Sequence, residues 1–142
     1  SLANKIKKNF ANFNLILSPA IGGIVIGYEI GRILNTETIF AERVNNIFEL
    51  RRGFEINKDH KVLIVEDVIT TGKSSLECST LVEKNGAKII GFASLIDRSD
   101  GKSKISKKII SQVELKISTY KEYEIPEKLK KIKAIKPGSR KL

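Results

Sequence analysis

The sequence predicts an α/β protein in which helices flank a central, mostly parallel β-sheet. Residues 61–65 form a continuous apolar run after one lysine, and residues 88–96 form a second run. Such runs are typical of strands buried on both faces of a parallel sheet. Residues 74–85 between them have helical spacing, with Leu76, Leu81 and Val82 facing inward and Gly86 at the expected end. A strand, a helix and a strand in this order form one parallel crossover unit.

The elements before this unit follow from the spacing of apolar residues. Residues 2–13 carry apolar side chains at intervals of three or four, which predicts a helix. Residues 15–17 predict a short buried strand that ends at Ser18-Pro19. Residues 21–34 predict a helix whose later glycines allow close packing against neighbouring backbone. The chain therefore alternates helix and strand from its start.

The other elements are shorter. Residues 38–42 predict a strand with residues 48–50 as a hairpin partner across Asn45-Asn46. After the crossover unit we expect a polar loop, a strand near residues 113–117 and a short helix that begins at Pro126. No internal repeat interrupts this order, so residues 1–142 are expected to form a single domain.

Composition narrows the class of protein. The chain has 142 residues, of which 41% are hydrophobic and 30% charged, as in ordinary core-forming domains. Its single cysteine, Cys78, has no partner for an internal disulfide, and the start has no signal-peptide pattern. We therefore expect a cytoplasmic protein without a membrane span. The absence of methionine indicates that the sequence is a possible fragment.

The net charge of +10 is concentrated in the last third of the chain. Residues 102–142 hold 13 of the 26 basic side chains and only 4 of the 16 acidic ones. The basic residues there are lysines with one exception, and no aromatic side chains alternate with them as base stacking would require. We interpret this part as a solvated lysine-rich surface rather than a nucleic-acid site.

The residues that indicate chemistry lie between positions 62 and 74. Glu66 and Asp67 follow a buried strand, and the small and hydroxyl residues 70–74 then open a helix. Ligands of open parallel sheets bind at the carboxyl ends of the strands. Backbone amides, hydroxyl groups and a helix N-terminus together suit a phosphate monoester. Gly22-Gly23, which also follow a strand, could likewise let a phosphate approach the backbone.

A nucleotide-hydrolase phosphate loop is excluded by one position. Gly72-Lys73-Ser74 matches the end of that motif, but the motif needs glycine where this sequence has Asp67. A carboxylate would repel a triphosphate, whereas it suits hydroxyl groups or developing positive charge. The pair of acids therefore predicts a sugar beside the phosphate.

Three further features have a structural and a functional interpretation. Arg43, Arg51 and Arg52 form either an anion-facing loop or a solvated turn. His60, the only histidine, is interpreted as a turn residue rather than a catalytic base. Cys78 is interpreted as a small buried thiol.

The segment 62–74 resembles the signature of the type I phosphoribosyltransferases. That signature is four hydrophobic residues, two acids, two hydrophobics, two small hydroxyl residues, glycine, any residue and a hydroxyl residue, and this sequence matches all thirteen positions. Residues 17–24 resemble the pyrophosphate loop of the orotate phosphoribosyltransferase family, and residues 95–98 resemble its Asp-Arg after a strand. Segments 40–53 and 136–140 are similar to a bacterial subgroup.

The resemblance implies the type I phosphoribosyltransferase fold and an activity. Members of the orotate family transfer the phosphoribosyl group of phosphoribosyl diphosphate to orotate, with Mg²⁺, and release pyrophosphate. They are usually homodimers, so we expect a homodimer. The family's N-terminal hood, which closes over the base, is expected upstream of Ser1 and is not visible in this sequence.

Residue by residue, the resemblance also implies a site. Glu66, Asp67 and Arg43 would be catalytic, the first two through the ribose hydroxyls and Arg43 by neutralising pyrophosphate. Thr70 and Arg98 would contact orotate, in agreement with the fit of a guanidinium to a carboxylate. No protein metal ligand is implied, because Mg²⁺ bridges substrate oxygens and keeps waters. The implied substrate-binding residues are Ile21, Gly22, Glu66, Asp67, Val68, Ile69, Thr70, Thr71, Gly72, Lys73, Ser74 and Arg98.

The sequence departs from the family between Arg43 and Phe48. Relatives have a mobile loop with lysines and a histidine there, whereas this chain has Val44-Asn45-Asn46-Ile47.

Two other functions remain as alternatives. One is transfer to a purine or to uracil, and the other is a non-catalytic regulator that senses phosphoribosyl diphosphate and binds nucleic acid.

Overall fold

The structure is a computed structural model that describes residues 1–118, 120–133 and 135. The elements, in chain order, are α1 (Leu2–Asn9), β1 (Leu15–Pro19), α2 (Gly22–Leu34), β2 (Glu37–Val44), β3 (Ile47–Leu50), β4 (Lys61–Ile69), α3 (Lys73–Lys84), β5 (Lys88–Asp97), β6 (Ile109–Glu114), a 3-10 turn (Glu122–Glu124) and α4 (Glu127–Lys130). Within these residues, every helix falls short of the length and apolar character that a bilayer crossing needs.

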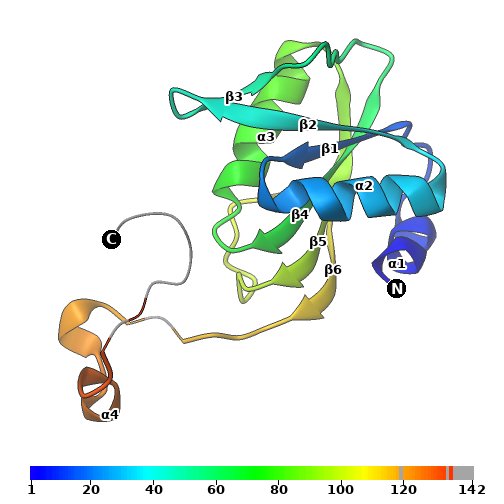
Figure 1. The fold of residues 1–142 in the computed structure, drawn as a ribbon. Helices are drawn as coiled ribbons and strands as arrows, with labels where there is room; N and C mark the ends of the chain where they lie inside the picture. Colours follow the sequence, from blue (N-terminus) through cyan, green and yellow to red (C-terminus); the bar gives the residue numbers. More distant parts are fainter. Residues whose placement is uncertain (119, 134, 136–142) are drawn as a thin grey trace.

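The six strands form one sheet in the order β3-β2-β1-β4-β5-β6 (Figure 1). The pairs β1–β2, β1–β4, β4–β5 and β5–β6 are parallel, and only β2–β3 is antiparallel. The prediction of a mostly parallel α/β sheet is therefore confirmed. The chain leaves β1 toward β2 and β3 and returns to β4 on the other side of β1. The junction of β1 and β4 is thus the point at which strand order reverses, where open α/β sheets bind ligands.

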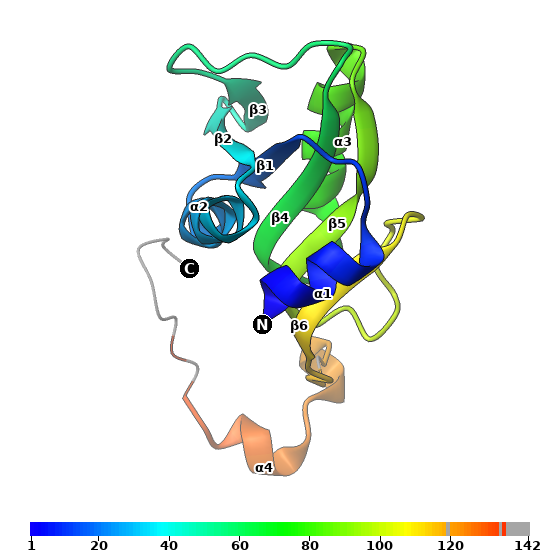
Figure 2. The same ribbon diagram turned by 90° about the vertical axis from the view of Figure 1, so that its right-hand side faces the viewer.

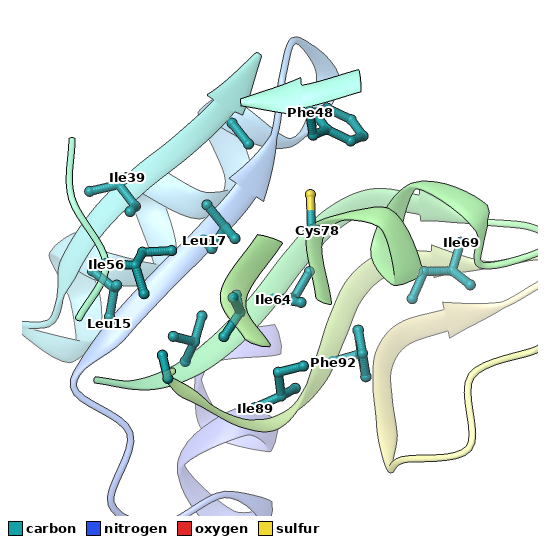
Figure 3. Packing of buried hydrophobic residues seen from close by; sticks show 14 residues of the cluster. Leu15, Leu17, Ile39, Phe48, Ile56, Ile64, Ile69, Cys78, Ile89 and Phe92 are labelled. Atoms are coloured by element: carbon teal, nitrogen blue, oxygen red, sulfur yellow. The ribbon is translucent and has the colours of Figure 1, made fainter. Parts of the chain in front are cut away.

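Helices cover both faces of the sheet, α3 on one and α1 with α2 on the other (Figure 2). Alternate strand residues supply the two cores, since successive side chains point to opposite faces. Leu17 and Ile64 pack on the α3 side with Cys78 and Phe92 (Figure 3). Leu63, one residue before Ile64, belongs to the core below α1 and α2.

Two boundaries near the N-terminus differ from the predicted ones. α1 ends at Asn9, although Phe10 still packs into the core beneath it. β1 does not stop at Ser18, because Ser18 and Pro19 continue the ladder opposite Phe40 and Ala41. Proline is tolerated there because the pairing of β1 with β4 ends at Leu17, so no ladder bond to β4 is required from the proline nitrogen.

The strand after the crossover unit is placed differently from the prediction. β6 covers Ile109–Glu114, with Phe92 of β5 opposite Ile109, so the predicted strand at 113–117 is about four residues too late. The hairpin across Asn45-Asn46 is confirmed, with both asparagines in the left-handed region at φ 49° and 66°. The short helix after Pro126 is also confirmed.

Helix α3 approaches the sheet through small side chains. Val82 is buried and Leu81 packs against the core as predicted, but Leu76 is only half-buried and lies outside that core. The buried face consists instead of Ser75, Cys78, Ser79 and Val82. Small residues allow the helix to lie close to the carboxyl end of β4.

Candidate active site

The parallel register brings the predicted site residues to one edge of the sheet. β1, β4 and β5 run in the same direction, so Ile21-Gly22, residues 70–74 and Arg98 follow strand ends that lie side by side. Arg43 lies near the end of β2, which is parallel to β1. Segments that are up to 77 positions apart, from Ile21 to Arg98, therefore meet at the carboxyl edge.

The loop between β4 and α3 is shaped to receive an anion. Gly72 begins the helix in the left-handed region, at φ 78°, and a side chain there would lie 2.8 Å from Ile105. The amide of Lys73 donates to Oγ1 of Thr71 at 3.3 Å. The first-turn amides of an α-helix have no acceptor within the helix. Residues 70–74 thus present amides and hydroxyl groups at a helix N-terminus, as predicted.

β4 is longer than predicted and continues to Ile69, so both acids lie within the strand. Glu66 is 6% exposed, and Oγ of Ser75 donates a hydrogen bond to its Oε1. Asp67 is half-buried and turns to the opposite side, toward the start of α2. The two adjacent carboxylates therefore face different ways, as successive residues of a strand do.

Glu66 has an unusual protonation equilibrium. Burial raises the pKa of Glu66 to about 7, and the negative charge of Asp67 adds to this effect. The hydrogen bond from Ser75 and the positive charge of Arg43 lower the pKa in opposition. The hydroxyl of Ser94, opposite Glu66 on β5, is buried without a hydrogen-bond partner in the described residues. Glu66 can therefore change charge near neutral pH.

The absence of a side chain at Gly22 is required by the neighbouring carboxylate of Asp67. A Cβ at Gly22 would overlap the Asp67 carboxylate, and one at Gly23 would lie 3.1 Å from the carbonyl oxygen of Val65. The loop after β1 therefore lies directly against the end of β4. Ile21 is 84% exposed beside it.

Arg43 is held by contacts on three sides. Its Nη2 contacts the carboxylate of Glu77 on α3, and its Nη1 donates to the carbonyl oxygen of Asn46 at 2.8 Å. The guanidinium carbon lies 4.1 Å from the centre of the Phe48 ring. Arg43 thus lies on the α3 side of the edge, the side that Glu66 also faces.

Arg98 lines a cavity of about 460 Å³ together with Thr70 and Thr71 of the phosphate-type loop. Its amide donates to the carbonyl oxygen of Ile69 at 2.8 Å, which fixes the start of the segment after β5. Among the described residues, the Arg98 side chain forms no ion pair, because Asp97 accepts from the Ser99 amide and Asp100 pairs with two lysines. Within the described residues, the Arg98 guanidinium is therefore not held by Asp97 or Asp100.

The remaining candidates take structural places. Arg52 pairs with Glu42 at 2.8 Å and lies over the Phe40 ring, so it is engaged within the β2–β3 hairpin. His60 is a turn residue whose Nδ1 accepts from the amide of Asn57 at 3.1 Å, as predicted. Cys78 is fully buried, and burial raises the pKa of its thiol, which confirms an inert core position.

Comparison with known proteins decides the family. Residues 1–130 match the family model called phosphoribosyl transferase domain. A protein named orotate phosphoribosyltransferase from Maricaulis maris is 45% identical over 141 residues, which are 99% of this chain and 73% of that protein. A protein of the same name from Caldanaerobacter subterraneus has the same identity and coverage. The chain belongs to the orotate phosphoribosyltransferase family.

Solved structures agree at the level of the fold. An adenine phosphoribosyltransferase from Thermoanaerobacter pseudethanolicus is 21% identical, with a TM-score of 0.69 over 80% of this chain and 76% of that one. An orotate phosphoribosyltransferase from Aeropyrum pernix is 18% identical, with a TM-score of 0.67 over 81% and 68% of the two chains. The predicted type I phosphoribosyltransferase fold is confirmed.

The structure adds to the candidate site two residues that sequence reasoning missed. Ser75 directly follows the signature and reaches Glu66, and Glu77 reaches Arg43 across the sheet edge. A serine on the inward face of a helix was a signal for the first. The spacing of four between Lys73 and Glu77 was a signal for the second. The segment 136–140, which resembles a bacterial subgroup, lies outside the described residues.

Proposed function

We propose that the chain transfers the 5-phosphoribosyl group of phosphoribosyl diphosphate to orotate, giving orotidine 5′-monophosphate and pyrophosphate. The observation that carries this proposal is the convergence, at one sheet edge, of the loop at residues 70–74, the acids of β4 and Arg98, which forms no ion pair with a described residue. Relatives named for this activity cover nearly the whole chain. A homodimer is part of the proposal.

In this proposal the loop at residues 70–74 holds the 5′-phosphate. Thr70, Thr71 and Ser74 supply hydroxyl groups, and the start of α3 supplies amides and the positive end of the helix dipole. Val68 and Ile69 would contact the substrate through their backbone. The side chain of Ile69 is buried in the core, and its carbonyl oxygen accepts a hydrogen bond from the Arg98 amide. The phosphate anchors the sugar above the end of β4.

The acids stabilise the charge that develops during the transfer. Positive charge grows on the ribose as pyrophosphate leaves the anomeric carbon. Asp67 orients the ribose hydroxyls, and Glu66 in its charged form adds a negative potential at short range. Arg43 neutralises the departing pyrophosphate, with Ile21 and Gly22 beside it at the end of β1.

The residues present fit a magnesium ion that is held mainly by the substrate. Among the residues that the structure describes, no three acidic, histidine or cysteine side chains come together as a metal cage. Mg²⁺ needs few protein ligands when phosphate and hydroxyl oxygens of a substrate and water complete its shell. When bound, it supplies charge neutralisation for the leaving group. Asp67 would help to hold the ion indirectly, by orienting the ribose hydroxyls of the substrate.

Arg98 and Thr70 recognise the base. They line the same cavity of about 460 Å³, which also contains Tyr120 and Lys116 from the segment after β6. A guanidinium makes two parallel hydrogen bonds with a carboxylate, and among the bases considered only orotate carries one. This geometry favours orotate over a purine or uracil.

The test is pyrophosphate release by the chain with phosphoribosyl diphosphate, Mg²⁺ and one base at a time. We expect release with orotate and none with adenine or uracil. Arg98→Ala is expected to lower kcat/KM for orotate about tenfold to hundredfold, since a charged hydrogen bond contributes roughly 1.5–3 kcal/mol. Arg98→Lys, which keeps the charge without the fork, should recover only part of the loss.

Three results would contradict the proposal. Release with adenine but not orotate would assign another base, and an unchanged kcat/KM in Arg98→Ala would remove the role of Arg98. No release with any base, together with tight and salt-dependent binding of RNA or DNA, would favour the regulator.

A further inference from the structure

Glu77 brings a negative charge close to the loop at residues 70–74, which is proposed to bind an anion. Its carboxylate contacts Nη2 of Arg43, and its Oε1 lies 3.9 Å from Nζ of Lys73. Lys73 and Glu77 are one turn apart at the start of α3, the helix that opens behind the phosphate-type loop. One acid therefore pairs with two cations from two different elements.

The position of Arg43 depends on these contacts. Besides Glu77, the guanidinium meets the carbonyl oxygen of Asn46 at 2.8 Å and the face of the Phe48 ring. The Asn46 and Phe48 contacts come from its own hairpin, whereas Glu77 is the partner from α3. Glu77 thus draws the side chain across the edge toward the loop at residues 70–74.

Water reaches both members of this pair. The side chains of Arg43 and Glu77 are 33% and 31% exposed, and that of Lys73 is 78% exposed. Ion pairs that remain in contact with water are weak, because solvent screens the attraction. A diphosphate carries more charge than a carboxylate and offers several oxygens. It can therefore replace Glu77 as the partner of both cations.

We propose that Glu77 is a positioning residue that serves as an internal counter-ion for Arg43 and Lys73 and competes with pyrophosphate for them. Without an anion, Glu77 keeps the two cations beside the loop. With pyrophosphate bound, its charge opposes the ligand and favours release. The identity of the competing anion rests on the proposed function, whereas the pairing of Glu77 does not.

The test is the affinity of the full chain for pyrophosphate, measured by calorimetry with Mg²⁺ and without any base. Glu77→Gln keeps the shape of the side chain and removes the charge. We expect the Kd for pyrophosphate to fall about five- to tenfold and the KM for phosphoribosyl diphosphate to fall in the same direction. The KM for orotate should not change.

Glu83→Gln is the matched control. Glu83 lies on the same helix farther from the loop, is exposed, and takes part in no ion pair with a described residue. Its substitution removes the same charge and should change the Kd for pyrophosphate less than twofold. In an Arg43→Ala background, Glu77→Gln should change the Kd for pyrophosphate much less, because the main cation that pairs with Glu77 is absent.

The proposal is overturned by any of four results. These are equal tightening in Glu83→Gln, weaker binding in Glu77→Gln, a lower Tm with unchanged Kd, and no pyrophosphate binding by any variant. The predicted tightening in a chain that fails to use orotate would instead contradict the proposed substrate and leave the role of Glu77 supported.

Discussion

Glu66 couples the protonation of one carboxyl to the proposed activity. Because burial raises the pKa of Glu66 to about 7, only part of the protein has the charged carboxylate at neutral pH. The proposed transfer uses that charge, so we expect kcat to rise as pH increases through about 7. Ser75→Ala removes the hydrogen bond that favours the charged form and should move this rise to higher pH.

Thr80→Ala provides the control for this pH profile. Thr80 is an exposed hydroxyl residue on α3 that donates to the backbone of its own helix and not to Glu66. Its profile should match that of the unsubstituted chain. A rise of kcat at the same pH in Ser75→Ala would show that the hydrogen bond does not govern the charge that the reaction uses.

The raised pKa of Glu66 also makes the free energy of unfolding depend on pH. The folded state retains the Glu66 proton between the usual pKa of 4.5 and about 7, where the unfolded chain has lost it. The free energy of unfolding therefore falls as pH rises through this window, by at most about 3 kcal/mol. Glu66→Gln should remove this part of the pH dependence, and denaturant unfolding at pH 5 and pH 8 measures it.

Sequence reasoning succeeded best at residues whose role depends on local pattern. The signature at residues 62–74 was sufficient to place Glu66, Asp67 and the loop at residues 70–74 near the carboxyl end of one buried strand, although that strand continues past both acids to Ile69. The contacts of Ser75 and Glu77 depend on how closely α3 approaches the sheet and where β2 ends, so they needed the structure. The reason for Gly22, contact with Asp67, also crosses two elements.

At the scale of elements, helix α2 depends on close contact with the strands beneath it. A Cβ at Gly27 would overlap the Ser18 side chain, which is fully buried at the end of β1. We expect Gly27→Ala to lower the free energy of unfolding by about 1–3 kcal/mol through overpacking. Urea unfolding measures the change, and Ile33→Ala, at a 48% exposed position on the same helix, is the control.

An equal cost for both variants would contradict this account of α2. Gly27→Ala keeps helix propensity or improves it, so a loss of stability would come from packing alone. The close packing of α2 was predicted from its glycines.

Element identity was easier to predict than element boundaries. Buried parallel strands such as β4 and β5 have long apolar runs, so their existence was clear from the sequence. β4 continues through two acids because its ladder with β5 extends to Ile69, and the apolar pattern carries no signal for acidic strand residues. β6 is an edge strand with half-buried residues, so several registers fit its sequence equally well.

At the scale of the whole molecule, the outer face of α2 supports the proposed homodimer. Ile21, Val25 and Tyr28 are 84%, 76% and 63% exposed, and exposed apolar residues in one row are typical of an interface. We expect sedimentation to give twice the chain mass of 15.8 kDa. Val25→Asp should yield the single-chain mass, whereas Ile47→Asp, at an exposed position on β3, should leave the larger mass unchanged.

A single-chain mass at micromolar concentration would contradict the homodimer. A larger mass that Val25→Asp does not reduce would place the interface elsewhere.

The charge distribution is a separate property of the whole chain. Every described lysine after residue 101 is exposed, which agrees with a solvated surface, and the absence of a nucleic-acid site stays a prediction.

The two-residue turn at Asn45-Asn46 has a kinetic consequence. Both residues adopt left-handed φ angles, as in the tight turns that suit hairpins, and Val44 and Ile47 pair directly beside them. The backbone that carries Arg43 is therefore fixed, and the guanidinium can change partners only by bond rotation. Exposed side chains rotate in picoseconds to nanoseconds, whereas flaps of backbone close in microseconds to milliseconds. The proposed contact of Arg43 with the leaving group would therefore form on the shorter of these timescales.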